Sequence, residues 1–248
     1  WYSGCGIYRH VWLTKAQKMA YIPQWGQYVS TTPQGDVKVK VDYLAHGSKM
    51  KLSIRNTVYD ADGKVVAKSL GNKVQQLKVK NPQLWDIAKG YLYTVKSELV
   101  VNGKVMDTAT TTTGFREVKF DAQKGFFLNG RNIKINGVCE HHDFGCLGAA
   151  VNEDAMHRKL TILRDMGVNA IRSSHNPPAP ELLNMCDSMG ILVMDESFDM
   201  WRRKKSNGDY ARFFDEWHKR DLSDLIKRDR NHPSIIMWSI GNEVLEQW

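Results

Sequence analysis

Hydrophobic and polar residues alternate with a period of two in the first half of the chain, and the pattern changes after about Phe115. In the first half, Asp62-Gly63 and Asn102-Gly103 separate short alternating segments and supply the positive backbone torsions that tight hairpins need. About seven strands over roughly 90 residues are typical of a β-sandwich. The expected strands include residues 37–41, 50–54, 65–66, 74–79, 91–95 and 99–101. Residues 110–113 are either the last strand of the sandwich or an exit linker.

The second half alternates apolar segments of strand character with helical segments. Asn152 is placed to cap a first helix and Gly167 to end it, whereas Pro180 opens a second helix and Gly190 closes it. A third helix carries its apolar residues between 214 and 225. The expected strands are residues 132–138, 168–174, 191–197 and 233–243.

Polar residues follow each of these four strands. They are His141, His142 and Asp143, then His175 and Asn176, then Asp195 and Glu196, and finally Asn242 and Glu243. An open doubly wound sheet would produce a similar alternation of strands and helices. Because every strand ends in groups suited to binding, and not only the pair at a switch point, the pattern favours the first half of an α/β barrel.

The fourth of these segments is an apolar run that ends abruptly on Asn242 and Glu243. The carboxyl ends of barrel strands form the active-site face, so an acid at this point indicates chemistry. The alternative is an exposed acid that follows a strand and has no role. We take Glu243 as the first candidate for a catalytic residue, held by the scaffold at the rim of a hollow.

Composition and charge narrow the class of protein only slightly. The chain has 248 residues, 42% hydrophobic and 25% charged, as in an ordinary globular protein. Its net charge of +8 is concentrated between Asp36 and Arg116, where lysines alternate with valines, a pattern that favours a solvated sheet face over a nucleic-acid surface. The run Arg202–Lys205 either contacts an anion or is simply exposed. No apolar run is long enough to span a bilayer, and we expect neither a nucleic-acid nor a membrane partner.

The cysteines and the chain ends add two further expectations. Cys5, Cys139, Cys146 and Cys186 show no C-x-x-C spacing, which indicates neither a zinc site nor a disulfide framework. The chain begins at Trp1 and ends five residues after Glu243, so we expect a fragment that holds half a barrel. Its unpaired strand edges would favour a homo-oligomer. The sequence leaves the compartment open, and the bacterial cytoplasm and periplasm are both compatible with it.

Five motifs in order along the chain resemble glycoside hydrolase family 2, the family of β-galactosidases, β-glucuronidases and β-mannosidases. They are Gly4–Leu13, Asn81–Trp85, Phe126–Gly130, Arg172–Pro177 and Trp238–Glu243. The resemblance implies the end of an amino-terminal sugar-binding jelly roll over residues 1–24 and an immunoglobulin-like β-sandwich over 25–113. It implies the first half of a catalytic TIM barrel over 114–248.

The resemblance also implies roles for particular residues. The family hydrolyses β-glycosides with retention by double displacement, which requires an acid/base and a nucleophile. Glu243 matches the acid/base, and Asn242 matches a donor to the sugar 2-hydroxyl. His175 and His141 resemble two histidines that line the substrate site, although each could be a structural histidine. The family's nucleophile follows the seventh strand, beyond Trp248, so we expect this chain alone to be inactive.

Two further residues are candidate substrate contacts with structural alternatives. Arg172 lies on an apolar strand and should be paired with Asp195 or Glu196, either as a purely structural ion pair or as part of the substrate site. Trp201 could offer its aromatic face to a sugar ring or could be ordinary packing.

The resemblance gives no support for a metal cofactor. Some β-galactosidases of the family hold magnesium through the acid/base together with a Glu and a His, and the matching positions here are Asp199 and Trp201. Tryptophan cannot ligate a metal, so we expect no cofactor.

The sequence therefore predicts part of a retaining β-glycosidase that cleaves terminal β-galactosides, with a β-linked oligosaccharide or glycoside as its partner. β-Glucuronidase is the nearest alternative, and β-mannosidase is a further one. A β-glucuronidase needs a cationic clamp for the sugar carboxylate, and in the family the residues of that clamp lie downstream of this chain. A non-catalytic carbohydrate-binding fragment is an alternative of a different class.

Overall fold

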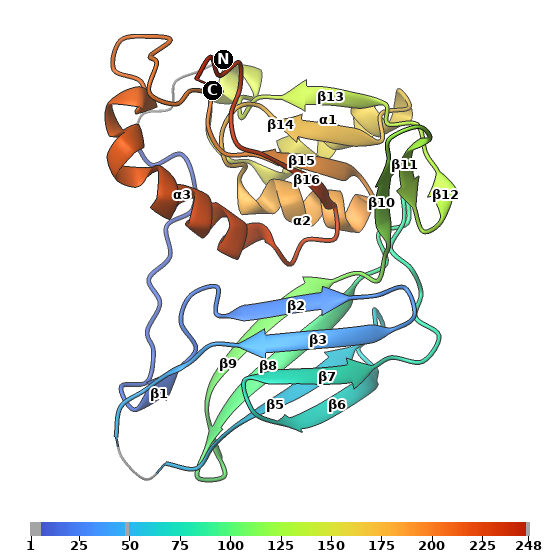
Figure 1. Cartoon of the computed structure of the whole chain (residues 1–248), viewed down its shortest axis with the longest axis vertical. Coiled ribbons are helices and arrows are strands. Elements are labelled where there is room, and N and C mark those ends of the chain that lie inside the picture. The colour runs from blue at the N-terminus through green and yellow to red at the C-terminus, as the bar shows by residue number, and fades with distance from the viewer. Residues whose placement is uncertain (1–5, 48–49, 247–248) are drawn as a thin grey trace. The chain divides into compact units, whose positions relative to one another are not determined.

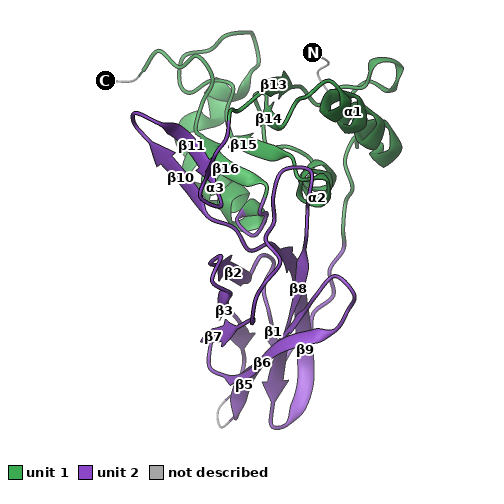
Figure 2. Ribbon diagram, turned by 90° about the vertical axis from the view of Figure 1, so that its right-hand side faces the viewer, with its two compact units in different colours: residues 1–12, 134–229, 234–248 green, residues 13–133, 230–233 purple. Residues whose placement is uncertain are grey.

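The chain folds into two compact units. A computed structural model describes residues 6–47 and 50–246. One unit, here called the barrel unit, contains residues 1–12, 134–229 and 234–248, and the other, the sandwich unit, contains residues 13–133 and 230–233. Figure 2 colours them separately. The sequence predicts three domains by their resemblance to family domains, whereas these two units are defined by contacts within the fold. The three-domain division therefore stays a prediction.

The sandwich unit is built mainly from two antiparallel sheets, with strand orders β2-β3-β7 and β6-β5-β8-β9 (Figure 1). A two-stranded sheet pairs β1 with β4. The strands are β1 (Ala20–Tyr21), β2 (Gln27–Thr31), β3 (Asp36–Val41), β4 (Leu44–Ala45), β5 (Leu52–Tyr59), β6 (Val65–Gly71), β7 (Val74–Lys78), β8 (Tyr93–Val101) and β9 (Lys104–Thr113).

Alternation of valine and lysine explains how β3 is placed in its sheet. Val37, Val39 and Val41 are at most 1% exposed, whereas the intervening Lys38 and Lys40 are exposed. The solvated face expected from the sequence is therefore confirmed. The hairpin between β8 and β9 turns on Asn102 and Gly103, whose φ angles are 50° and 84°, as the sequence predicts.

Strand β8 corrects one expectation from the sequence. Residues 91–95 and 99–101 were expected as separate strands, but Tyr93–Val101 is continuous. The pattern is interrupted because the polar Ser97 faces the core and is fully buried. Its hydroxyl donates to Asn56 Oδ1 at 2.7 Å and accepts from Gln27 Nε2 at 2.7 Å. A polar group whose hydrogen bonds are satisfied can replace an apolar one inside a core. A prediction based on hydrophobicity alone therefore split one continuous strand into two.

A second correction concerns the segment before the parallel sheet. The strand expected over residues 132–138 is divided between two structures. Asn132 ends a small antiparallel sheet formed by β10 (Val118–Asp121), β11 (Gly125–Leu128) and β12 (Arg131–Asn132). The first parallel strand begins only at Gly137.

The barrel unit contains a four-stranded parallel sheet in the order β13-β14-β15-β16. Its elements are β13 (Gly137–Glu140), η1 (Gly145–Leu147), α1 (Glu153–Asp165), β14 (Ala170–Ser173), α2 (Pro180–Met189), β15 (Leu192–Glu196), η2 (Tyr210–Phe213), α3 (Phe214–Asp229) and β16 (Ile235–Ser239). Apolar side chains of α1 and α2, such as Leu160 and Leu183, pack on Ile171 and Val193 of the sheet. This arrangement, after the sandwich, confirms the expected fold class.

The helix boundaries follow the capping residues identified in the sequence. Asn152 Oδ1 accepts a hydrogen bond from the Ala155 amide at 2.9 Å and caps α1. Pro180 is the first residue of α2, and Gly190 ends that helix in the left-handed conformation at a φ of 68°. No helix in the described ranges has the length and apolar character needed to cross a membrane.

Candidate active site

Strand alternation places the neighbouring acids of β15 on opposite faces of the parallel sheet. Arg172 of β14 is in register with Met194, two residues before Glu196, so Arg172 and Glu196 share a face. Asp195 points to the other face, where its carboxylate meets Ser173 and the carboxylate of Asp229. Of the two acids that the sequence offered as partners for Arg172, the structure therefore selects Glu196.

The carboxylate of Glu196 links three parallel strands. Its side chain is fully buried, and it accepts hydrogen bonds from Arg172 Nε at 2.9 Å and from Arg172 Nη2 at 2.7 Å. Ser239 Oγ, at the end of β16, donates at 2.5 Å, and His175 Nδ1, just after β14, lies 2.6 Å away. A buried carboxylate needs such partners because an isolated buried charge is costly.

The same network raises the pKa of Arg172. Burial alone would disfavour the guanidinium charge, but the hydrogen bonds and negative charge of Glu196 outweigh it. Arg172 Nη2 also donates to Asn242 Oδ1 at 2.9 Å. The guanidinium thus connects the buried acid to the polar pair that follows β16, and it stays charged throughout the physiological pH range.

Asn242 is held at both ends of its side chain. Its Oδ1 accepts from Arg172, and its Nδ2 donates to Asp199 Oδ1 at 3.0 Å. Its backbone amide donates to the carbonyl of Phe198 at 3.0 Å. The residue is 8% exposed. These contacts fix the amide orientation and leave the second Nδ2 hydrogen as the group that could donate to a ligand.

Glu243 follows on a backbone in an unusual conformation. Its φ is 48°, in the left-handed region that residues other than glycine rarely adopt, and such outliers cluster at functional sites. Its side chain is 80% exposed, and Lys205 Nζ lies 3.6 Å from its Oε2. Together with Trp201 it lines an open hollow, whose wall is otherwise formed by residues 200, 203–205 and 244–246. Glu243 therefore borders a concavity with a largely exposed side chain, and its role as acid/base stays a prediction.

Trp201 supports the turn that carries these residues. Its Nε1 donates to the carbonyl of Ile240 at 2.8 Å, and a side-chain carbon on Gly241 would lie 2.8 Å from that nitrogen. Its ring stacks on Phe214 at a centroid distance of 6.0 Å. The tryptophan thus packs against Phe214 and lines the hollow, and its contact with a sugar ring stays a prediction.

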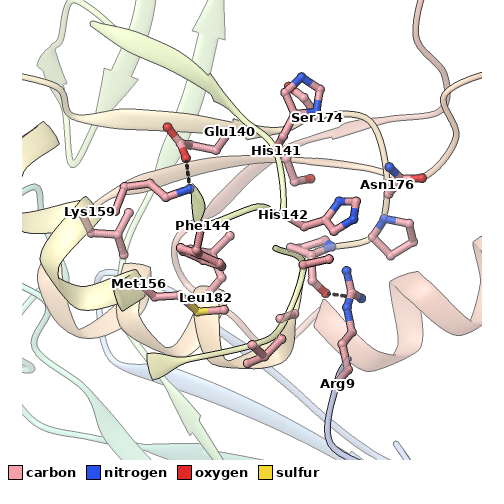
Figure 3. Close-up of a pocket in the computed structure, with 17 residues that line it drawn as sticks. Arg9, Glu140, His141, His142, Phe144, Met156, Lys159, Ser174, Asn176 and Leu182 are labelled. Carbon is pink, nitrogen blue, oxygen red and sulfur yellow. Dashed lines mark hydrogen bonds and ion pairs between the residues drawn. The ribbon is translucent and has the colours of Figure 1, made fainter. Parts of the chain in front are cut away.

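The two candidate histidines lie against each other. The rings of His141 and His175 meet edge to face, with their centroids 5.3 Å apart. His141 also lines a small pocket, with a cavity volume of about 40 Å³, that is drawn in Figure 3. Apolar side chains such as Phe144, Met156 and Leu182 form much of its wall, and an ion pair joins Lys159 Nζ to Glu140 at 2.7 Å (Figure 3). The lining of this pocket does not include Glu243.

Hydrogen bonds and a ring contact within the barrel unit connect Arg172, Asn242, His175 and His141, with Glu196 between the arginine and His175. Glu243 meets this group only through Lys205, and Trp201 contacts the backbone of Ile240. Two participants were not predicted. Ser239 holds Glu196, and Lys205 Nζ donates to Asp199 Oδ1 and to the carbonyl of Asn242, both at 2.9 Å. Ser239 gave no signal beyond its place at a strand end. Lys205 belongs to the basic run 202–205, and nothing in the sequence distinguishes it from a solvent-exposed loop lysine.

The arrangement does not fit a divalent cation. Between residues 6 and 246, omitting 48 and 49, no three His, Cys, Asp or Glu side chains converge as metal ligands. The oxygens of Asp199, Asn242 and Glu243 already surround an ammonium group. Trp201, at the position of a family ligand, donates its only polar hydrogen to a backbone carbonyl.

Comparison with known proteins accounts for nearly the whole chain. A family model for the TIM barrel domain of glycosyl hydrolases family 2 matches residues 118–247, and a second model of the same family matches residues 20–116. The chain belongs to glycosyl hydrolase family 2. Its membership explains why a sandwich precedes parallel strands that end in polar residues.

The relatives carry several activities of this family. The β-galactosidase BoGH2A of Bacteroides ovatus is 55% identical over all of this chain, which covers 31% of that protein. A putative β-glucuronidase of Formosa agariphila is 41% identical over 98% of this chain, which covers 24% of it. Among solved structures, a β-glycosidase from Bacteroides vulgatus matches with a TM-score of 0.94 and 38% identity, over 100% of this chain and 33% of its own. The chain thus spans about a third or less of the length of these relatives.

Proposed function

We propose that this chain supplies the acid/base side of the active site in a retaining β-glycosidase that cleaves terminal β-galactosides. The observation that carries the proposal is the turn after β16, where Arg172 and Asp199 fix the side chain of Asn242 and the next residue, Glu243, lines an open hollow. An acid protonates the leaving oxygen of a glycosidic bond, and a rigid amide donor beside it can bind the sugar 2-hydroxyl.

In this proposal Glu243 gives a proton to the leaving oxygen and later takes one from the attacking water. Asn242 donates to the sugar 2-hydroxyl with its free Nδ2 hydrogen. His175 and His141 bind sugar hydroxyls, with His175 oriented by its contact to Glu196. Arg172 holds Asn242, and Trp201 offers the exposed part of its ring to the substrate.

The covalent step needs a second carboxylate about 5 to 5.5 Å from the first. Glu196 and Asp199 are the acids that contact this cluster, and both are already paired with cations. We therefore assign the nucleophile to sequence that corresponds to the remaining length of the relatives. By itself, this chain is expected to show no turnover of an aryl β-galactoside.

A chimera tests the acid/base assignment. This chain would replace the matching segment of the Bacteroides ovatus β-galactosidase, and hydrolysis of an aryl β-galactoside would be measured. Loss of a general acid/base costs about 10²- to 10⁴-fold in rate, and we expect Glu243→Gln to fall in that range. Glu216→Gln, on the exposed first turn of α3, is the matched control and should keep the parental rate. A Glu243→Gln chimera with parental activity would refute the assignment.

The sugar preference needs a separate comparison. The proposal of a galactoside depends on similarity to BoGH2A, whereas β-glucuronidase is favoured by the Formosa agariphila relative. A longer protein that carries this chain, assayed with β-galactoside, β-glucuronide and β-mannoside, separates the two, because the residues expected to set the sugar preference lie downstream of this chain. Preferential hydrolysis of the β-galactoside supports the proposal, and preferential hydrolysis of the β-glucuronide contradicts it.

A carbohydrate-binding role without catalysis is distinguished by calorimetry. Galactose and glucuronic acid would each be titrated into the chain and into the active chimera. Binding without turnover in both proteins would favour the binding role over the enzyme.

A further inference from the structure

Lys205 places a positive charge inside the Asn242–Glu243 turn. Its ammonium donates to Asp199 Oδ1 and to the carbonyl oxygen of Asn242, both at 2.9 Å, and it lies 3.6 Å from Glu243 Oε2. The side chain of Lys205 is 30% exposed and that of Asp199 is 12% exposed. An ammonium group has three donors, and here three oxygens from two separate loops surround it.

The loop delivers this lysine in a fixed position. Asp209 Oδ2 accepts from the backbone amides of Lys205 at 2.7 Å and of Ser206 at 2.9 Å. Its other oxygen accepts from the Ala211 amide at 3.0 Å, at the start of η2. Arg202 of the same basic run instead pairs with Asp215 at the surface, where their side chains are 59% and 71% exposed. Lys205 therefore differs from a solvated loop lysine, because its backbone and its ammonium are both held.

Glu243 needs such a partner more than most acids do. Its backbone is in the left-handed region, and its side chain is 80% exposed, so few contacts fix the direction of the carboxylate. Rotamer freedom in an exposed glutamate costs catalysis, because a proton donor must meet its acceptor within hydrogen-bond distance. In the described part of the chain, the Lys205 ammonium is the cation that contacts this carboxylate.

We propose that Lys205 is a positioning residue that aims the Glu243 carboxylate and occupies the place a divalent cation would need. The inference depends on the proposed function, since it assigns how the acid/base of that site is oriented. It also explains why a tryptophan can stand at residue 201, because the lysine charge makes a metal-binding histidine there unnecessary.

The test uses leaving groups of different acidity in the Bacteroides ovatus chimera. A phenyl β-galactoside needs a proton on its departing oxygen, whereas dinitrophenolate leaves without one. If Lys205 aims the acid, Lys205→Met should lower kcat/KM for the phenyl substrate by about 10- to 100-fold and for the 2,4-dinitrophenyl substrate by less than about 3-fold. The ratio of the two values comes from one sample, so it does not depend on the fraction of protein that is folded.

Two variants serve as controls. Lys205→Arg keeps the cation and should hold the ratio within about threefold of the parent. Lys219→Met removes an exposed lysine of α3 and should change neither substrate. An equal fall for both substrates in Lys205→Met, no fall at all, or an arginine variant as selective as the methionine variant would each overturn the inference. A parent chimera that hydrolyses neither substrate would instead refute the proposed function.

Discussion

The buried pair of acids behind the sheet should make this protein less stable as the pH rises. Asp195 is fully buried at the end of β15, and the carboxylate of Asp229 lies next to it. Burial and that neighbouring negative charge raise the pKa of Asp195 to about 8. Its Oδ2 accepts no hydrogen bond from the described residues, and a proton on this oxygen would let it donate to Asp229. Arg228 already neutralises Asp229 through bonds of 2.6 and 2.7 Å.

The sign of the effect follows from proton binding. The folded chain keeps a proton on Asp195 up to a pH of about 8, whereas an unfolded aspartate loses it near 4. The folded state therefore binds more protons between these values, and its stability falls as the pH rises through that window. One unit of pKa corresponds to about 1.4 kcal/mol, so the free energy of unfolding should fall by at most about 4 kcal/mol between pH 4 and pH 7. Relaxation around the pair would reduce this, and we expect about 1 to 3 kcal/mol.

Asp195→Asn should remove this dependence. The asparagine amide donates to Asp229 without needing a proton, so the variant should be more stable than the parent above pH 7 and nearly equal to it near pH 4, where the window begins. Guanidinium denaturation at a series of pH values measures the free energy of unfolding of the variant and of the parent. The control is Asn152→Ala, which removes a helix cap but no titratable group, so it should lower the stability at every pH and keep the parental slope. An Asp195→Asn variant with an unchanged pH slope would refute the reasoning.

Three further predictions concern the turn, the cap and the metal. Gly241→Ala would bring a methyl group against Val244 and the Trp201 ring nitrogen. It should lower the free energy of unfolding by about 1 to 3 kcal/mol in chemical denaturation. An unchanged denaturation midpoint would contradict the packing described. Asn152→Ala removes the cap of α1 and should cost about 1 kcal/mol by the same measurement, whereas Asn152→Asp should retain most of the stability. A chelator should leave the rate of the Bacteroides ovatus chimera unchanged, and activity restored only by added magnesium would contradict the role given to Lys205.

Local signals in the sequence predicted the features that depend on neighbouring residues. The Asn102-Gly103 turn and the Asn152 cap involve backbone within a few residues, so residue type was enough to identify them. The four polar strand ends also follow from the sequence, because parallel strands bring their carboxyl ends to one edge of the sheet. From this rule, Arg172 and Asn242 were expected at one site, and their side chains form a hydrogen bond.

Contacts between distant residues could not be predicted in the same way. Ser97 looks like a break in a strand until Asn56, 41 residues away, is seen to satisfy its hydroxyl. Lys205 reads as one of four basic loop residues, and only the folded loop brings its ammonium to the carbonyl of Asn242, 37 residues away. The choice of Glu196 over Asp195 required the strand register, which fixes the direction of each side chain.

The backbone conformation of Glu243 favours glycine for stability, whereas the proposed chemistry needs a carboxylate at this position. A glycine would adopt the φ of 48° at less cost than any larger residue, so a sequence chosen for durability alone would discard the acid. Under the proposed function, a glutamate at this position lowers the stability of the fold and supplies the proton donor. Efforts to raise the thermal stability of this protein, by consensus substitutions or by screening for heat tolerance, should therefore leave Glu243 unchanged.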